Sequence, residues 1–123
     1  MADEAAEPLL AGAADWRAWL SDHVDEQAGV WLVLAKKGTK TPTSLAYEQA
    51  PDEALAHGWI DGMVKRRDDA TYRQRFTPRR RRSSWSRTNV ERVERLAHEG
   101  RMHPAGLAAV ERARADGLWP DPA

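Results

Sequence analysis

Apolar residues recur at helical spacing near the start of the chain. Asp15 can cap a helix, and the next positions at i, i+3, i+4, i+7 and i+8 carry Trp16, Trp19, Leu20, His23 and Val24. This spacing places them on one helical face, and Gly29 can end the helix. Residues 1–13 are rich in alanine and acidic residues. We therefore predict a flexible N-terminal arm at 1–13 and a single domain over 14–123.

A short, continuous apolar run follows from Val30 to Ala35 and is rich in β-branched residues. Such a run predicts a strand that is buried on both faces. After a polar loop, Thr43 or Ser44 can cap a second helix. Because a proline inside a helix costs ~3 kcal/mol, we predict a short turn and then a helix that restarts at Pro51 and reaches about His57.

Two alternating segments, Trp59 to Arg66 and Thr71 to Thr77, lie on either side of the sequence RDDA. This arrangement predicts an antiparallel hairpin. In the second strand, alternate residues share a face. One face carries Tyr72, Gln74 and Phe76, and the other carries Arg73, Arg75 and Thr77.

Two further helices are predicted after the arginine-rich loop that follows the hairpin. Ser86 can cap the first, which ends at Gly100, and Pro104 begins the second, which ends at Gly117. Their apolar stripes are Val90, Val93, Leu96 and Ala97, and then Leu107, Val110 and Ala113. The element order predicts a single α+β domain, with a small, mainly antiparallel sheet of about three strands packed with about four to five helices.

The composition is typical of a soluble globular domain, with 123 residues, 41% of them hydrophobic and 31% charged. The chain contains no cysteine, which excludes a disulfide framework and a thiolate metal site. Its longest apolar run, GVWLVLA, is far shorter than the ~20 residues of a membrane span. The acidic N-terminus lacks the basic start of a secretory signal. We therefore expect a cytoplasmic protein.

The net charge of zero hides a strong asymmetry along the chain. Residues 1–64 carry 4 basic and 11 acidic groups, residues 65–87 carry 10 and 2, and residues 88–123 carry 5 and 6. The middle segment therefore has a net charge of +8, between segments of −7 and −1. Because salt screens charges over ~8–10 Å, this local excess creates its own positive field.

Four segments occur in order along the chain: GVWLVLAKKG, YEQAPDEALAHGWIDG, YRQRFTPRRRRSSWSRTN and GRMHPAGLAAVERARADGLW. Within them, GWIDG is followed by RFTPR and then by WSxxN. On these motifs, the chain from about Trp16 to Trp119 resembles the YdeI/OmpD-associated family, also called bacteriocin-protection proteins. The resemblance implies a small bacterial protein associated with envelope stress or with protection from antimicrobial peptides, and it implies no catalysed reaction. Pro51 departs from the helix-compatible apolar residue expected at its position.

The basic segment is the strongest candidate for a binding surface. Arginine suits phosphates and carboxylates, Trp85 could stack a base, and the helix that starts at Ser86 adds backbone amide donors. We predict that an anionic partner, either nucleic acid or an acidic protein surface, binds in the groove between the hairpin and this helix. The predicted ligand-binding residues are Trp59, Asp61, Lys65, Arg75, Arg79, Trp85, Ser86, Arg87 and Asn89.

These assignments have structural alternatives. Asp61 lies between Gly58 and Gly62, and it either orients one of the arginines or accepts backbone hydrogen bonds at the start of a strand. The arginines either bind an external partner or pair with the acidic N-terminal half of the chain. Ser86 is explained by capping alone.

The histidines and serines of the chain do not favour an enzyme. The 4 histidines form no HxxxH or HExxH pair, so we predict neither a metal site nor a cofactor. Ser84 and Ser86 lack the glycines of a nucleophile elbow. A non-enzymatic binding protein is therefore the preferred hypothesis. The alternatives are a protein-interaction module that docks an acidic partner and a small-molecule enzyme that uses Asp61.

Overall fold

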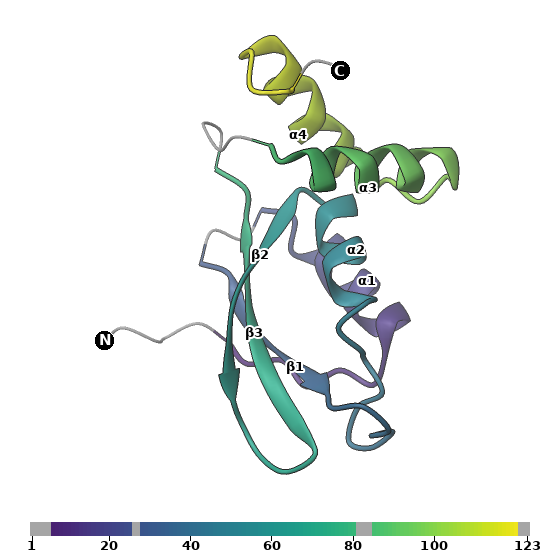
Figure 1. Ribbon diagram of the computed structural model, residues 1–123, viewed down its shortest axis with the longest axis vertical. Helices are drawn as coiled ribbons and strands as arrows, with labels where there is room; N and C mark the ends of the chain where they lie inside the picture. Colours follow the sequence, from purple (N-terminus) through teal and green to yellow (C-terminus); the bar gives the residue numbers. More distant parts are fainter. Residues whose placement is uncertain (1–5, 26–27, 81–84, 121–123) are drawn as a thin grey trace.

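The computed structural model of the protein describes residues 6–25, 28–80 and 85–120, and within them it has four helices and a three-stranded sheet (Figure 1). The order is α1 (Ala13–Asp22), β1 (Val30–Ala35), α2 (Ala50–Ala56), β2 (Trp59–Arg66), β3 (Thr71–Pro78), α3 (Arg87–His98) and α4 (Pro104–Ala115). The predicted α+β class and the element order are confirmed.

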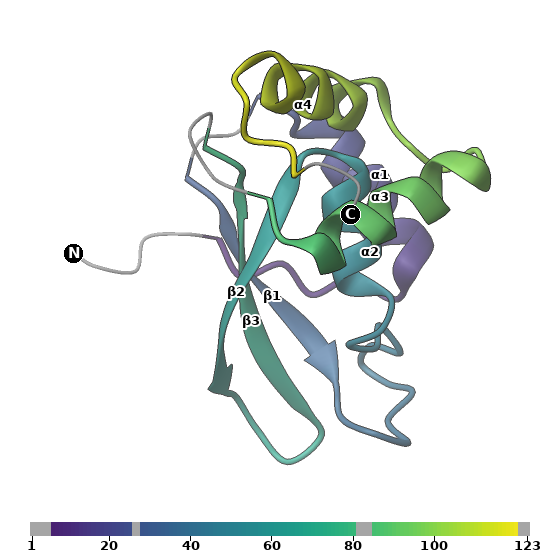
Figure 2. The same cartoon turned by 45° about the horizontal axis from the view of Figure 1, so that its top comes forward.

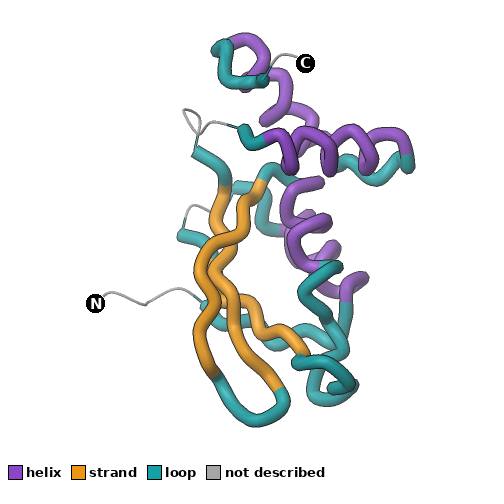
Figure 3. The backbone as a smooth tube through the Cα atoms, in the orientation of Figure 1, coloured by secondary structure: helices purple, strands orange, loops and turns teal. Residues whose placement is uncertain are grey.

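The sheet has the strand order β1-β3-β2, with both neighbouring pairs antiparallel. Helices α1 and α2 cover one face of the sheet, and α3 and α4 pack beyond one end of the strands (Figures 1 and 2). The backbone trace shows the β2–β3 hairpin extending past the helices at its turn (Figure 3). Every residue of β1 is buried, as its apolar run predicts.

The segment before α1 lies along the outer edge of β1, which corrects the prediction of a flexible arm for residues 6–12. The amide of Trp31 donates to the carbonyl of Ala6 at 2.8 Å, and that of Val33 donates to Pro8 at 3.2 Å. An edge strand leaves a row of amides that need partners, and this segment supplies them. Residues 1–5 of the predicted arm lie outside the described residues.

Helix boundaries follow the local signals in most places. Helix α2 has Pro51 in its first turn, as predicted, and Ser86 caps α3 by accepting a hydrogen bond from the Asn89 amide at 3.1 Å. Two predicted caps are wrong. Gly12 takes the N-cap of α1 in place of Asp15. The hydroxyl of Thr43 accepts from the Leu45 amide instead of capping a helix.

Among the residues that the structure describes, the buried apolar side chains form two clusters. The first lies between the sheet and helices α1 and α2 and includes Trp16, Leu20, Leu32, Trp59 and Phe76. The second joins α2 to α3 and α4 and includes Leu55, Trp85, Val90, Leu96 and Val110. Leu107, predicted to lie in the stripe of α4, is instead 47% exposed. No helix within the described residues has the length and apolarity needed to cross a lipid bilayer.

Candidate functional site

The nine predicted site residues lie in three places on the fold. Lys65 and Arg75 lie over Trp31, on the sheet face opposite the core residues of β1 and so away from α1 and α2. Trp59 and Arg79 line a cavity beside α4, and Asp61 acts electrostatically on Arg79. The remaining residues lie at or near the start of α3: Trp85, Ser86, Arg87 and Asn89.

On the sheet face away from the helices, three cations converge on one tryptophan. The distances to the centroid of the Trp31 ring are 4.8 Å from Lys65 Nζ, 5.0 Å from Arg73 Cζ and 5.6 Å from Arg75 Cζ. Antiparallel pairing explains the cluster, because Trp31 faces Arg75 across β1 and β3, and Lys65 faces Arg73 across β2 and β3. We call these four residues the Trp31 face.

The cations of the Trp31 face cover the ring and leave it only 4% exposed. Long basic side chains can lie along an aromatic surface while their charged ends stay in water. A cation over an aromatic ring stabilises such an arrangement by ~0.5–1 kcal/mol at an exposed site. The face therefore presents positive charge, and the aromatic ring lies beneath it.

Acidic residues of the chain neutralise part of this charge. Glu7 accepts from Arg73 at 3.0 Å and from Arg67 at 3.3 Å, and Arg67 also pairs with Asp68 at 2.9 Å. Arg75 donates to the backbone carbonyl of Ala28 at 2.8 Å. The predicted alternative of pairing with the acidic N-terminal half is therefore seen for Arg67 and Arg73, where one Glu7 carboxylate serves both guanidinium groups.

Trp85 is part of the core, which corrects its prediction as an open stacking surface. The guanidinium carbon of Arg79 lies 3.9 Å from the centroid of the Trp85 ring, and Trp119 packs against that ring at 5.1 Å. Trp85 is consequently 6% exposed. Burial lowers the pKa of Arg79 below its ordinary value, and the negative charge of Asp61 opposes this shift.

Trp59 is also buried in the core, with 1% of its surface exposed. Together with Arg79 it lines a cavity of about 340 Å³, which His57 and Arg112 also line.

At α3, the Ser86 hydroxyl caps the helix and Arg87 is exposed. Four residues of the basic segment and its loop, Arg81 to Ser84, lie outside the described residues.

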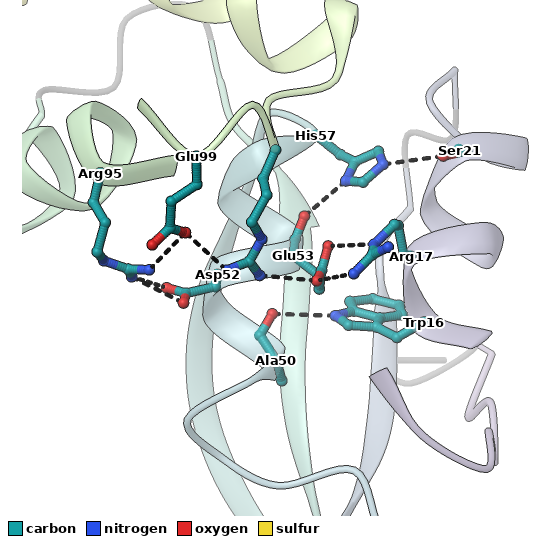
Figure 4. Close-up of polar contacts among 10 residues, drawn as sticks. Trp16, Arg17, Ser21, Ala50, Asp52, Glu53, His57, Arg95 and Glu99 are labelled. Atoms are coloured by element: carbon teal, nitrogen blue, oxygen red, sulfur yellow. Dashed lines mark hydrogen bonds and ion pairs between the residues drawn. The ribbon is translucent and has the colours of Figure 1, made fainter. Parts of the chain in front are cut away.

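A second polar cluster joins α1 to α2 and was not predicted (Figure 4). Arg17 and Ser21 lie one turn apart on α1, and His57, the C-cap residue of α2, lies one turn after Glu53. Residues four apart share a helical face, so the two helices meet in two parallel contacts, Arg17 with Glu53 and Ser21 with His57. The spacing is visible in the sequence, but the sequence does not indicate that these two faces meet.

Glu53 is the centre of this cluster and is 2% exposed. Its carboxylate accepts from Arg17 Nε at 3.2 Å and Arg17 Nη2 at 3.1 Å, and from Arg101 Nη2 at 3.1 Å. The hydrogen bond to Glu53 raises the pKa of Arg17. A buried carboxylate requires such partners because its desolvation is costly.

His57 has both ring nitrogens engaged. Its Nδ1 lies 2.7 Å from the carbonyl oxygen of Glu53, and its Nε2 lies 3.1 Å from the hydroxyl of Ser21. A carbonyl only accepts, so Nδ1 carries the proton. Burial lowers the pKa of His57, and in the neutral ring Nε2 accepts from Ser21. The ring also stacks on His103, with centroids 4.7 Å apart.

The model of a protein family described as "Domain of unknown function (DUF8412)" matches residues 9–109 of the chain. The matched range contains both the Trp31 face and the cluster around Glu53 and His57. No curated protein matches the chain, and no solved structure matches it.

Proposed function

The chain belongs to the family described as domain of unknown function DUF8412, and we propose that it is a binding protein for the phosphate backbone of nucleic acid. The proposed contact surface is the Trp31 face. The observation that carries the proposal is the convergence of Lys65, Arg73 and Arg75 over the Trp31 ring, within 5.6 Å of its centroid.

The position of this face supports the proposal. Within the described residues the helices pack on the other side of the sheet or beyond its end (Figures 1 and 2), so a long ligand can approach the strands. Lys65 is exposed and Arg75 is half-buried.

The net charge of the side chains on and beside the Trp31 face also favours an external anion. The Trp31 face and the neighbouring Arg67 carry four positive charges. Glu7 and Asp68 are the carboxylates that pair with Arg67 and Arg73, so these six side chains together have a net charge of about +2. Guanidinium groups bind phosphate oxygens through two parallel hydrogen bonds. Because Trp31 is covered and Trp85 is in the core, we propose backbone contacts without base stacking. Such contacts carry no sequence specificity.

The double variant Lys65→Gln/Arg75→Gln tests this proposal. It removes two charges from the face, and each lost phosphate contact should lower the salt slope of binding by roughly 0.7 for a single strand. We expect the affinity for a fluorescein-labelled single-stranded oligonucleotide to fall by about tenfold or more at 50 mM salt. Fluorescence anisotropy measures both quantities.

The matched control is Lys37→Gln/Lys40→Gln, which removes two exposed charges from the β1–α2 loop. This control should bind nearly as the unchanged protein does, and near-ultraviolet circular dichroism should show the native fold in both variants. Equal affinity of the two double variants would show that the Trp31 face is not the contact surface. Capture of an acidic protein that survives nuclease treatment would point instead to a protein-interaction module.

We further propose, from the resemblance to the YdeI/OmpD-associated family, that the protein acts in the bacterial cytoplasm during envelope stress or exposure to antimicrobial peptides. Deleting the gene should then increase sensitivity to a bacteriocin or cationic peptide, and the unchanged gene should restore resistance. The measurement is the minimal inhibitory concentration of the peptide. An unchanged value in the deletion strain would remove this physiological role and leave the binding proposal standing.

A further inference from the structure

A small cavity opens beside His57, on the side of α1 and of the loop between α3 and α4. Its volume is about 290 Å³, and its polar lining consists of Arg17, Ser21, His57, Arg101 and His103. Ser21 is exposed at this cavity, whereas His57 is 4% exposed. Ser21 is thus an exposed residue, while the ring within hydrogen-bond distance of its hydroxyl is held inside the protein. Figure 4 shows the two side chains pointing toward one another.

We propose that Ser21 and His57 are the nucleophile and general base of a site that hydrolyses small carboxylic esters. The site is separate from the Trp31 face, and it does not depend on the proposed binding of nucleic acid. The argument rests on the orientation of the His57 ring, on its neutral state and on the donors that surround the cavity.

The orientation of the ring is fixed by the backbone. Because the carbonyl of Glu53 accepts from Nδ1 at 2.7 Å, the lone pair of the neutral ring is on Nε2, which lies 3.1 Å from the Ser21 oxygen. A nucleophile and a base within hydrogen-bond reach, with the base oriented by a third group, is the arrangement that activates a serine hydroxyl. Here a main-chain carbonyl takes the orienting role that a carboxylate has in the Ser-His-Asp triad.

The surroundings keep the ring neutral and able to accept a proton. Burial lowers the pKa of His57, and the positive charge of Arg17 from α1 acts in the same direction. The Glu53 backbone and carboxylate in α2 oppose this shift, and His103 at the start of α4 supports it. On its other side, His57 adjoins the cavity that is also lined by Asp25, Arg79 and Arg112.

The same cavity offers hydrogen-bond donors for the oxyanion. The Ala105 amide donates to His103 Nδ1 at 3.0 Å, so the neutral His103 ring carries its proton on Nε2. Arg17 lies one turn before Ser21 on α1 and, like Arg101, uses its guanidinium group only in part for Glu53. Arg101 also donates to Glu99 through Nη1 at 3.1 Å. Because each guanidinium group has five N–H donors, both groups can still donate to a substrate oxygen.

The reaction balances with water as the only co-reactant. The Ser21 oxygen attacks the ester carbonyl while its proton moves to His57 Nε2. The bond to the alcohol oxygen breaks, and that oxygen takes the proton from Nε2. Water then attacks the acyl-serine, returning a proton through Nε2 to the Ser21 oxygen as the acid leaves. The small cavity limits the acyl group to a short one.

The test compares the full-length protein with Ser21→Ala, using p-nitrophenyl acetate as the substrate. A general base that activates a nucleophile contributes about 100-fold or more, so turnover should fall by at least that factor in Ser21→Ala. The control Ser44→Ala removes an exposed hydroxyl that donates to the carbonyl of Ala11, and it should retain activity within about twofold. Background hydrolysis by surface histidines is the same in these proteins, so it cancels when their rates are compared.

Two further readouts separate catalysis from a structural role of the Ser21–His57 hydrogen bond. An alkyl fluorophosphonate should form one covalent adduct, and mass spectrometry should locate it on Ser21. Turnover should fall as the pH drops through the lowered pKa of His57, because protonated Nε2 cannot accept, and it should be constant above pH 7. Equal turnover in Ser21→Ala and the unchanged protein would overturn the proposal, and so would the absence of an adduct on Ser21.

Discussion

Gly106→Ala is expected to destabilise the protein by about 2–3 kcal/mol, although alanine is the better helix former. At an ordinary helical position this change gains up to about 1 kcal/mol. In α4, an added Cβ would lie 2.0 Å from the carbonyl oxygen of Ala56 and 2.6 Å from its carbonyl carbon. These atoms are backbone, so the clash cannot be relieved by a rotamer change and must separate α4 from α2.

The same contact holds the helices in place, because the Ala56 carbonyl accepts from the His103 amide at 3.0 Å. Thermal unfolding should therefore show a melting temperature lower by roughly 10 °C for Gly106→Ala. Gly12→Ala is the control, since its Cβ would meet only the Ser44 hydroxyl, at 3.4 Å. A Gly106→Ala variant as stable as the unchanged protein would mean that α4 does not pack on α2 in this way.

Trp16→Ala is expected to have the largest effect on stability, a loss of about 3–5 kcal/mol. Trp16 is fully buried between α1 and the sheet, with Trp19 and Phe76 both 5.5 Å away between ring centroids. Its indole also donates to the carbonyl of Ala50 at 3.1 Å, so truncation leaves both a cavity and a lost hydrogen bond. Urea denaturation at equilibrium measures the loss.

Two further variants provide comparisons for the loss of stability in Trp16→Ala. Trp16→Phe keeps most of the ring packing and should lose less stability than Trp16→Ala, chiefly through the bond to Ala50. Trp119→Ala removes a tryptophan that is only half-buried and should also cost less. Equal losses in Trp16→Ala and Trp119→Ala would show that the first apolar cluster is not the main core.

Features that depend on neighbouring residues could be predicted from the sequence. The apolar run of β1 indicated its bounds, and the fixed geometry of proline placed Pro51 in the first turn of α2, which begins at Ala50. The hydroxyl of Ser86 indicated the start of α3, where it forms the predicted cap. In each case the physical cause lies within a few residues of the feature.

Features that depend on how the elements pack could not be predicted in this way. Trp31 and Trp85 show the difference. The continuous apolar run around Trp31 indicates burial but not what covers the ring, which is a set of cations from β2 and β3. Trp85 follows an arginine-rich loop and so was predicted to be open, but Arg79 and Trp119 enclose it.

The cluster of Glu53 and His57 could not be predicted for the same reason, because it depends on how the helices pack. Each residue belongs to a helix whose polar positions look ordinary in the sequence, and only the packing of α1 on α2 joins them to Arg17 and Ser21. The segment along β1 is a further example, because its pairing with Trp31 and Val33 uses backbone groups that any sequence offers. Side-chain patterns carry no information about such contacts.

The salt dependence of nucleic-acid binding tests the central proposal most directly. The unchanged protein would be titrated against a fluorescein-labelled single-stranded oligonucleotide at about 50 mM and 200 mM salt. Three phosphate contacts give a slope of about −2, so this fourfold rise in salt should weaken binding roughly 20-fold. Saturable binding with that dependence would support the Trp31 face as a phosphate-binding surface. Failure to bind at 50 mM, or an affinity that salt does not change, would contradict it.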